Sequence, residues 1–400
     1  MSPDRSPVGG AGRTLGRRLS RAPGRAPGRS GRNGPASVFL SAGEQSGDEH
    51  GARLATELRR RSPDLRVAGL GGSRMAAAGV ELLADLDELA VLGFTEVLGR
   101  IPAFVRLRRR VRRFLVEQEI DLLIPIDYPG FNLSLARYAH RRGIRVLYYI
   151  APQVWAWRES RARTLGAHTD HVCVVLPFER ELLAGYGADV EFVGHPLLDA
   201  AMEREGDDDR PAAPTLGLFP GSRVQEVKRM LPVFLEAADR LDREFPGLRL
   251  LVARAPDLPE PLYERWARGK LAPPEEVVSG ATAALTKSGT VTLQLAIGGV
   301  PMVVGYRMSP LTYLLARRLV KVEHVALVNL VAGKRLVAEL LQSELTAARL
   351  AELAAPLLRE GDPTRARVVD GLAHVRSRLG EPGCTARVAD RCLDLLERSR

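Results

Sequence analysis

The chain has 400 residues, of which 45% are hydrophobic and 26% are charged, a composition typical of a soluble globular protein with room for two domains. Its formal net charge is +10, but residues 1–34 hold eight arginines and a single acid and so supply +7 of that total. No apolar run approaches the ~20 residues that cross a bilayer. The three cysteines lack CxxC spacing, which argues against a disulfide framework or a zinc site and favours a reducing cytoplasm.

Residues 1–34 are rich in Gly, Pro, Ser and Arg and show no apolar periodicity, so we expect a disordered basic tail. The tail has no apolar h-region, which argues against a secretory signal. A transit peptide, an arm for nucleic acid or membrane, and an inert extension are the alternatives, and we favour the inert extension. No nucleic-acid partner is therefore expected.

A first α/β domain is expected over residues 35–205. It begins with a short strand at 37–40, which runs into the Gly-rich sequence SAGEQSGD at 41–48 and then a helix. Polar side chains on the loop after a first strand lie at the carboxyl edge of the sheet, where such folds bind ligands. The spacing does not match GxGxxG, so no dinucleotide site is expected. The candidate ligand-binding residues of this loop are Glu44, Ser46 and Asp48.

Residues 91–118 combine apolar residues at helical spacing with six arginines between 106 and 113. One interpretation is a core helix with a solvated basic face. The other is a helix that lies on an anionic membrane surface. On the second interpretation the membrane-contacting side chains are Val97, Leu98, Ile101, Phe104 and Val105.

A strand over 121–127, with the sequence DLLIPID, places Asp127 at its carboxyl end. A second strand over 144–150 leads to a loop that holds Trp155 and Trp157, two of the three tryptophans of the chain. These rings either cap the sheet or stack against a sugar ring, and we favour the sugar.

His168, Asp170 and His171 also follow in this half. They read as a polar turn before a strand, so no metal site is expected.

The acidic, loose stretch at 203–214 marks the boundary between domains. A second α/β domain with a parallel sheet is expected over 215–345, because strand-like and helix-like segments alternate there. Within its first helix, predicted over 231–243, Pro232 fits the first turn or a kink but not the interior. Residues 346–400 are expected to form terminal helices that pack back on the first domain.

The stretch 215–229, TLGLFPGSRVQEVKR, predicts a strand, a tight turn and a helix start, which together can hold an anion. Gly221 lets the backbone come close, Ser222 can cap the helix, and Arg223 offers a bidentate fork for phosphate. One turn of this kind is equally consistent with an ordinary strand-to-helix turn that carries a surface arginine and binds no ligand. A second small-residue loop precedes another helix in the same half, and the pair predicts a nucleotide-diphosphate site; the residues of that second loop are Ser288, Gly289 and Thr290.

Taken together, these stretches resemble the lipid-A-disaccharide synthase family, which are inverting glycosyltransferases of the GT-B type. The matching stretches follow one another in order from residue 37 onward and include SAGEQSGD (41–48), VLGFTEVLGRIP (91–102), PIDYPGFN (125–132), YYIAPQVWAWR (148–158), FVGHPLLD (192–199), FPGSRVQEVKRMLP (219–232) and KSGTVTLQLA (287–296). The resemblance implies an α/β fold with two Rossmann-like domains facing a cleft, and C-terminal helices. It also implies that UDP-2,3-diacylglucosamine and 2,3-diacylglucosamine 1-phosphate are joined into a β-1′,6 disaccharide with release of UDP.

Transfer from UDP needs a base for the acceptor hydroxyl and cations or dipoles for the leaving diphosphate. Asp127 is the expected base, and Glu44 is the alternative base or positions the acceptor. Arg223 with its turn, together with the 288–290 loop, is expected to hold the diphosphate. Two further residues, Arg307 and Asn329, are expected to line the same cleft.

The chain departs from the family in two places. Gln294 stands where the family usually has a glutamate suited to the donor ribose, so a hydrogen-bond acceptor is kept and a charge is lost. The stretch from Leu251 to Glu275 is also shorter than in the family, near the expected place of the nucleotide base.

The resemblance implies no cofactor and no metal, and a cytoplasmic protein attached peripherally to the anionic inner face of the cytoplasmic membrane. A homodimer is left open. The alternative functions are another GT-B transferase or epimerase that uses UDP-N-acetylglucosamine, and a nucleotide-sugar-binding protein without turnover.

Overall fold

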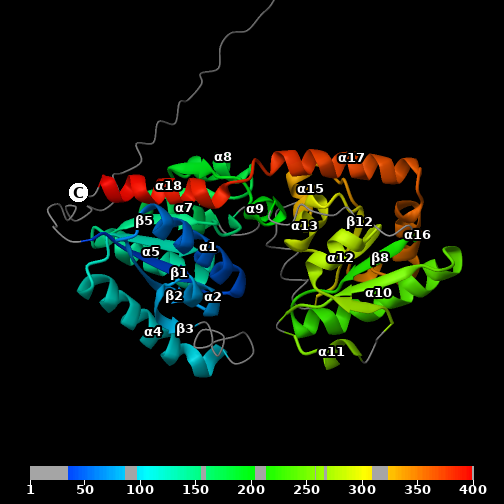
Figure 1. Ribbon diagram of the computed structural model, residues 1–400, viewed down its shortest axis with the longest axis horizontal. Helices are drawn as coiled ribbons and strands as arrows, with labels where there is room; N and C mark the ends of the chain where they lie inside the picture. The colour runs from blue at the N-terminus through cyan, green and yellow to red at the C-terminus, as the bar shows by residue number, and fades with distance from the viewer. Residues whose placement is uncertain are drawn as a thin grey trace, which may run out of the picture.

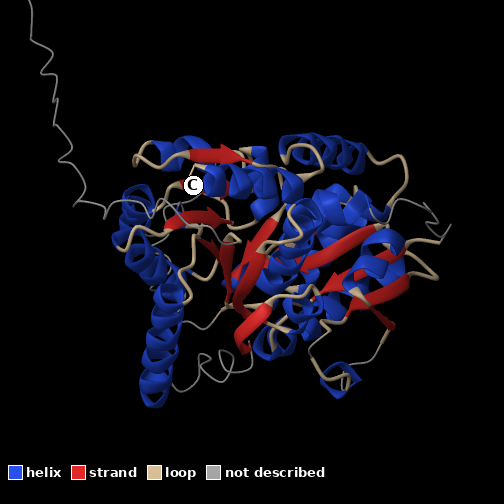
Figure 2. Cartoon of the chain, turned by 60° about the vertical axis from the view of Figure 1, so that its left-hand side comes forward, coloured by secondary structure: helices blue, strands red, loops and turns tan. Residues whose placement is uncertain are grey.

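The computed structural model describes residues 35–85, 97–154, 159–202, 213–256, 258–264, 268–308 and 323–398, and the basic tail at 1–34 lies outside these ranges. Within them the chain forms two parallel sheets, of seven and six strands (Figure 1). Helices flank the strands of both sheets (Figure 2). The expected α/β class with two Rossmann-like sheets is confirmed.

The first sheet has the strand order β3-β2-β1-β4-β5-β6-β7. Its strands are β1 (Ser37–Ala42), β2 (Arg66–Gly71), β3 (Glu81–Asp85), β4 (Leu122–Ile126), β5 (Arg145–Tyr149), β6 (His171–Val174) and β7 (Val190–Phe192). The helices that connect and follow them are α1 (Gln45–Arg61), α2 (Ser73–Ala77), α4 (Val97–Glu117), α5 (Pro129–Arg141), α7 (Glu159–His168), α8 (Glu179–Ala184) and α9 (Pro196–Met202). Strand β4 is buried along its whole length, as expected of a central parallel strand that is covered on both faces.

The second sheet has the order β10-β9-β8-β11-β12-β13. Its strands are β8 (Thr215–Phe219), β9 (Arg249–Ala253), β10 (Lys270–Ala272), β11 (Ala283–Lys287), β12 (Met302–Tyr306) and β13 (Glu339–Leu341). Its helices are α10 (Val224–Glu244), α11 (Pro261–Glu264), α12 (Pro274–Gly280), α13 (Val291–Ile297), α15 (Leu327–Ala332) and the short 3₁₀ helix η1 (Gln342–Glu344). In both sheets the strand order reverses beside the first strand, at β1/β4 and at β8/β11. Ligands bind at such switch points in open α/β sheets.

Helix α10 corrects one sequence-based expectation. It begins at Val224 and so places Pro232 in the helix interior rather than in the first turn. The buried stripe of α10 runs past this position through Met230, Leu231 and Phe234. Burial of those side chains outweighs the ~3 kcal/mol that a proline costs inside a helix.

Three terminal helices complete the chain, α16 (Ala347–Leu358), α17 (Pro363–Arg378) and α18 (Cys384–Glu397). We expected all of them on the first domain, but the structure divides them. Helix α16 packs on α10, and α17 packs on α13 and α15 of the second domain. Helix α18 packs on the first domain, against α1 and α9 (Figure 1).

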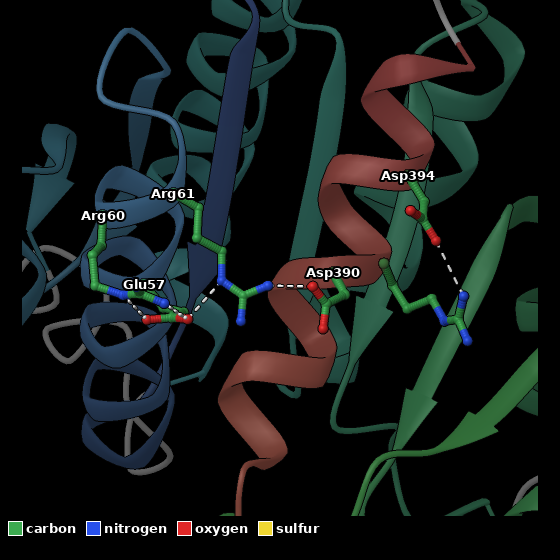
Figure 3. A network of polar contacts seen from close by, with 6 residues as sticks. Glu57, Arg60, Arg61, Asp390 and Asp394 are labelled. Atoms are coloured by element: carbon green, nitrogen blue, oxygen red, sulfur yellow. Dashed lines mark hydrogen bonds and ion pairs between the residues drawn. The ribbon is translucent and has the colours of Figure 1, made fainter.

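Polar contacts fasten α18 to the first domain. The carboxylate of Asp199, from α9, accepts the main-chain N–H groups of Gly383, Cys384 and Thr385 at 2.6–3.1 Å and so caps the helix. On the α1 side, Arg61 bridges Glu57 of its own helix and Asp390 of α18 (Figure 3). The chain is thus tied back to its first helix by its last.

Helix α4 supports the core interpretation for the part whose side chains are described. Leu107, Val111 and Leu115 are buried in the first domain. The ring of Phe104, expected to contact a membrane, instead packs edge-on against Phe131, with ring centroids 5.4 Å apart. Val105 is half-buried. The side chains of the other expected contact residues, Val97, Leu98 and Ile101, lie outside the described part of the structure.

No helix in the described ranges is long and apolar enough to cross a membrane.

Candidate active site at two sheet switch points

Asp127 follows β4 directly and sits at the switch point of the first sheet. Its backbone is left-handed, with φ at +44°, and that of Tyr128 is left-handed too, with φ at +48°. This region is sparsely populated by residues other than glycine, so neighbouring contacts must hold it. The carbonyl oxygen of Asp127 accepts hydrogen bonds from Asn132 Nδ2 (2.8 Å) and the Tyr148 hydroxyl (2.7 Å), and its N–H donates to the carbonyl oxygen of Tyr149 (3.1 Å). Hydrogen bonds therefore fix the Asp127 main chain at both its N–H and its carbonyl oxygen.

The environment of Asp127 makes its carboxylate more basic. Burial and, to a lesser extent, the negative charge of Glu44 together raise its pKa to about 6. The N–H of Tyr128, which donates to the carboxylate, and the guanidinium of Arg161 act in the opposite direction. A carboxyl group with a pKa just below neutrality is ionised at pH 7 and is well matched to accept a proton.

The loop after β1 brings Glu44 to the same edge. Glu44 is exposed and occupies the N-cap position of α1, and Ser46 is exposed in the first turn. Gly43, which directly precedes Glu44, is covered by the ring of Tyr128. A Cβ added to Gly43 would lie 2.2 Å from that ring. The glycine therefore lets the β1 loop and the β4 loop meet face to face.

Asp48 has another role from the one expected. Its buried carboxylate accepts the main-chain N–H groups of Gly72 (2.6 Å), Arg74 (3.1 Å) and Met75 (3.1 Å). It thereby caps the start of α2. Asp48 serves the fold, and we leave it out of the proposed site.

The turn that was expected to bind an anion lies at the switch point of the second sheet. Gly221 has φ at +121°, which favours glycine, and the 21-residue helix α10 begins directly after Arg223. The side chain of Arg223 is 71% exposed. Lys287 ends the neighbouring strand β11, and its Nζ lies 3.0 Å from Glu226 Oε1. Two cations and a helix start therefore meet at this edge.

The second small-residue loop follows Lys287. The Ser288 hydroxyl donates to the carbonyl oxygen of Val325 at 2.8 Å, which ties this loop to the chain before α15. Gly289 is half-buried and Thr290 is exposed at the N-cap position of α13. Gln294 is half-buried within α13.

Asn329 and Arg307, which were expected to line the cleft, form hydrogen bonds within the second domain. Both donor bonds of the Asn329 amide go to Val337 and Glu339, and its oxygen accepts the N–H groups of Leu336 and Val337. Arg307 donates to the carbonyl oxygens of Gln342 and Leu345. These contacts fix β13 and the chain after it, so both residues support the sheet instead of joining the proposed site.

The residues His168, Asp170 and His171 form part of the first domain framework. The Asp170 carboxylate accepts the N–H of Val146 at 2.9 Å, and His171 Nδ1 lies 2.9 Å from Asp189 Oδ2. Among the described residues, no group of three His, Cys, Asp or Glu side chains is placed to hold a metal ion.

Lys287 and Glu226 were not among the predicted site residues, although both lie within the stretches that predicted the phosphate-binding turns. The only local signal for either was its charge beside a glycine turn. Trp155 and Trp157 were expected at the sugar, and they lie outside the described residues.

Solved structures that are similar to this fold include glycosyltransferases and epimerases. The chain superimposes on a putative UDP-N-acetylglucosamine 2-epimerase from Listeria monocytogenes with a TM-score of 0.63, at 12% identity, covering 88% of this chain and 94% of the other. With MurG of Acinetobacter baumannii the TM-score is 0.54, at 16% identity, covering 89% and 99%. At these identities the likeness concerns the fold alone. Two parallel sheets with polar loops at both switch points define an α/β protein of the GT-B class.

Sequence relatives narrow the class. The family described as "Lipid-A-disaccharide synthetase" matches residues 38–388. The lipid-A-disaccharide synthase of Geobacter sulfurreducens is 42% identical over 376 residues, covering 90% of this chain and 97% of the relative. That of Myxococcus xanthus is 41% identical over 380 residues, covering 92% and 99%. The chain belongs to the lipid-A-disaccharide synthase family and is a glycosyltransferase.

Proposed function

We propose that this chain transfers the acylated glucosamine of UDP-2,3-diacylglucosamine to 2,3-diacylglucosamine 1-phosphate, giving a β-1′,6 disaccharide 1-phosphate and UDP. Family membership supports the reaction. The observation on the molecule that carries the chemistry is the Asp127 carboxylate, held in a left-handed backbone at the β1/β4 switch point with its pKa raised to about 6.

In this proposal the acceptor hydroxyl oxygen attacks C1 of the donor sugar in one displacement, which inverts the configuration at that carbon. The hydroxyl proton passes to Asp127. The bond from C1 to the diphosphate oxygen breaks, and its electron pair leaves with UDP. Asp127 needs only to be ionised and within hydrogen-bond reach of the hydroxyl.

Glu44 has a supporting role at the first edge. It is exposed beside Asp127, and its charge acts on the Asp127 carboxylate. We assign it to positioning the acceptor and keeping Asp127 basic. Ser46, exposed in the first turn of α1, is available to the same substrate.

The leaving diphosphate is assigned to the second edge. Arg223 and Lys287 supply positive charge, and the 221–223 turn opens α10, whose N-terminal dipole favours an anion. Ser288, Gly289 and Thr290 lie on the neighbouring loop, and Gln294 can accept a hydrogen bond from the ribose. This arrangement stabilises the departing negative charge without a metal ion.

Substrates with fatty acyl chains must be reached at a membrane, so we propose a peripheral attachment to the inner face of the cytoplasmic membrane. The exposed arginines of α4 support it, because cations attract an anionic lipid surface. The described apolar side chains of α4 pack inwards, so the attachment is assigned to charge.

Incubation of the purified chain with both acylated sugars tests the proposal, with mass spectrometry as the readout. The disaccharide 1-phosphate and UDP should appear in equal amounts. Epimerised donor without disaccharide would indicate an epimerase, and bound but unreacted donor would indicate a nucleotide-sugar-binding protein.

A further inference from the structure

A carboxylate of the chain itself already occupies the anion-binding turn of the second sheet. Glu226, in the first turn of α10, folds back so that its Oε2 accepts the N–H of Ser222 at 3.1 Å. Its Oε1 lies 3.0 Å from Lys287 Nζ and 3.9 Å from Arg223 Nη1. The side chains of Glu226 and Lys287 are only 15% and 17% exposed. An anion thus sits between the turn after β8 and the end of β11.

The position of this carboxylate depends on Gly221. A Cβ added to Gly221 would lie 2.4 Å from Glu226 Oε2, closer than atoms in contact can approach. The missing side chain of Gly221 therefore provides the space in which the carboxylate rests. A turn built around an anion in this way also fits the oxygens of a phosphate group, which accept the same hydrogen bonds.

The proposed function assigns these donors to the diphosphate of UDP. The single N–H of Ser222 cannot serve the Glu226 carboxylate and a phosphate oxygen at the same time. Two anions side by side at the partly buried Lys287 ammonium also repel each other. Either Glu226 moves when the diphosphate arrives, or the diphosphate binds elsewhere.

We propose that Glu226 is an internal counter-anion that exchanges with the diphosphate. In the free chain it neutralises Lys287 and holds the turn in shape. When UDP-sugar binds, the diphosphate takes the donors and the carboxylate turns away. After transfer the carboxylate returns and helps to release UDP. This inference rests on the proposed function, and it adds that the site weakens its own hold on the product.

Calorimetric titration of the full chain with UDP, pyrophosphate and uridine tests the exchange. Glu226→Gln keeps the size of the side chain and its ability to accept the Ser222 N–H, but removes the charge. UDP and pyrophosphate should bind this variant about tenfold more tightly than wild type, because they no longer compete with a carboxylate. Uridine, which has no phosphate, should bind both proteins equally.

Glu276→Gln is the matched control. Glu276 lies 2.6 Å from Lys270 Nζ in an exposed ion pair of the same domain, so its removal should leave all three affinities unchanged. If Glu226→Gln does not fold, Glu226→Ala carries the same expectation, because it also removes the carboxylate that competes with the phosphate groups.

The outcomes separate this inference from the proposed function. If wild type binds UDP and Glu226→Gln binds it equally or more weakly, the proposed exchange with the diphosphate is wrong. Glu226 then only holds the side chain of Lys287 in position. If wild type does not bind UDP at all, the proposed function fails first.

Discussion

The hydroxyl of Tyr148 donates a hydrogen bond of 2.7 Å to the main-chain carbonyl oxygen of Asp127. Tyr148 is fully buried in the neighbouring strand β5. The contact therefore holds the left-handed main chain of Asp127 from inside the sheet. It leaves the carboxylate of Asp127, the proposed base, free of this bond. It makes Tyr148 a positioning residue for the reaction.

Tyr148→Phe should lower kcat roughly tenfold with little change in KM, because the carboxylate loses part of its fixed orientation. The carbonyl oxygen keeps its bond from Asn132, so the loss of stability should stay near 0.5–1.5 kcal/mol. Steady-state kinetics and thermal unfolding measure both effects. Tyr263→Phe removes another buried phenol bond, to the Ala255 N–H, and should cost similar stability with kcat unchanged. An unchanged kcat in Tyr148→Phe would contradict the proposal that Tyr148 positions Asp127.

The pH dependence of kcat/KM should report Asp127. The base must be ionised, so activity should fall as the pH drops through about 6, the pKa to which burial and Glu44 raise this carboxyl. Glu44→Gln removes one of the two causes of that rise, so the acid limb should move to lower pH. Loss of activity at every pH in Glu44→Gln would instead make Glu44 the base. Glu49→Gln, on the same helix, is the control.

Arg223→Ala should weaken UDP binding by about one to two decades. A charge-assisted hydrogen bond to phosphate contributes roughly 1.5–3 kcal/mol, and this side chain is 71% exposed, so the fold loses little. Calorimetry gives the affinity. Arg240→Ala, further along α10, is the control and should bind UDP as wild type does. An unchanged affinity in Arg223→Ala would remove this turn from the donor site.

Attachment to lipid should depend on the exposed arginines of α4. Each basic residue near an anionic surface contributes about 1 kcal/mol, so the double change Arg106→Glu and Arg109→Glu should lower sedimentation with anionic vesicles more than tenfold. High salt should have a similar effect on wild type. The control is Arg240→Glu with Arg243→Glu on α10. Equal sedimentation of the α4 variant and wild type would place the lipid contact elsewhere.

The sequence predicted features that depend on neighbours along the chain. The apolar run before Asp127 placed that residue at the end of a buried strand, and the run before Gly221 predicted the strand, turn and helix that the structure has. Alternating segments also predicted the parallel sheet of the second domain. Strand periodicity, glycine turns and helix starts are local signals, and they were sufficient for these elements.

The sequence could not predict which way a polar side chain faces in the folded chain. Asp48 was assigned to a ligand because it follows a strand, but α2 brings three N–H groups onto its carboxylate from more than twenty residues away. The contact between Glu226 and Lys287 joins residues 61 positions apart. Such pairs depend on how strands are ordered in the sheet, which the local pattern does not specify.

The measurement that tests the central claim most directly compares wild type with Asp127→Asn in one assay, following disaccharide 1-phosphate and UDP over time with both acylated sugars present. If Asp127 takes the proton from the acceptor hydroxyl, wild type should form both products in equal amounts. Asp127→Asn should then form them about 10²–10⁴-fold more slowly, with similar KM and unchanged UDP affinity. Retention of about a third or more of the wild-type kcat in Asp127→Asn, or release of UDP without disaccharide by wild type, would contradict the account.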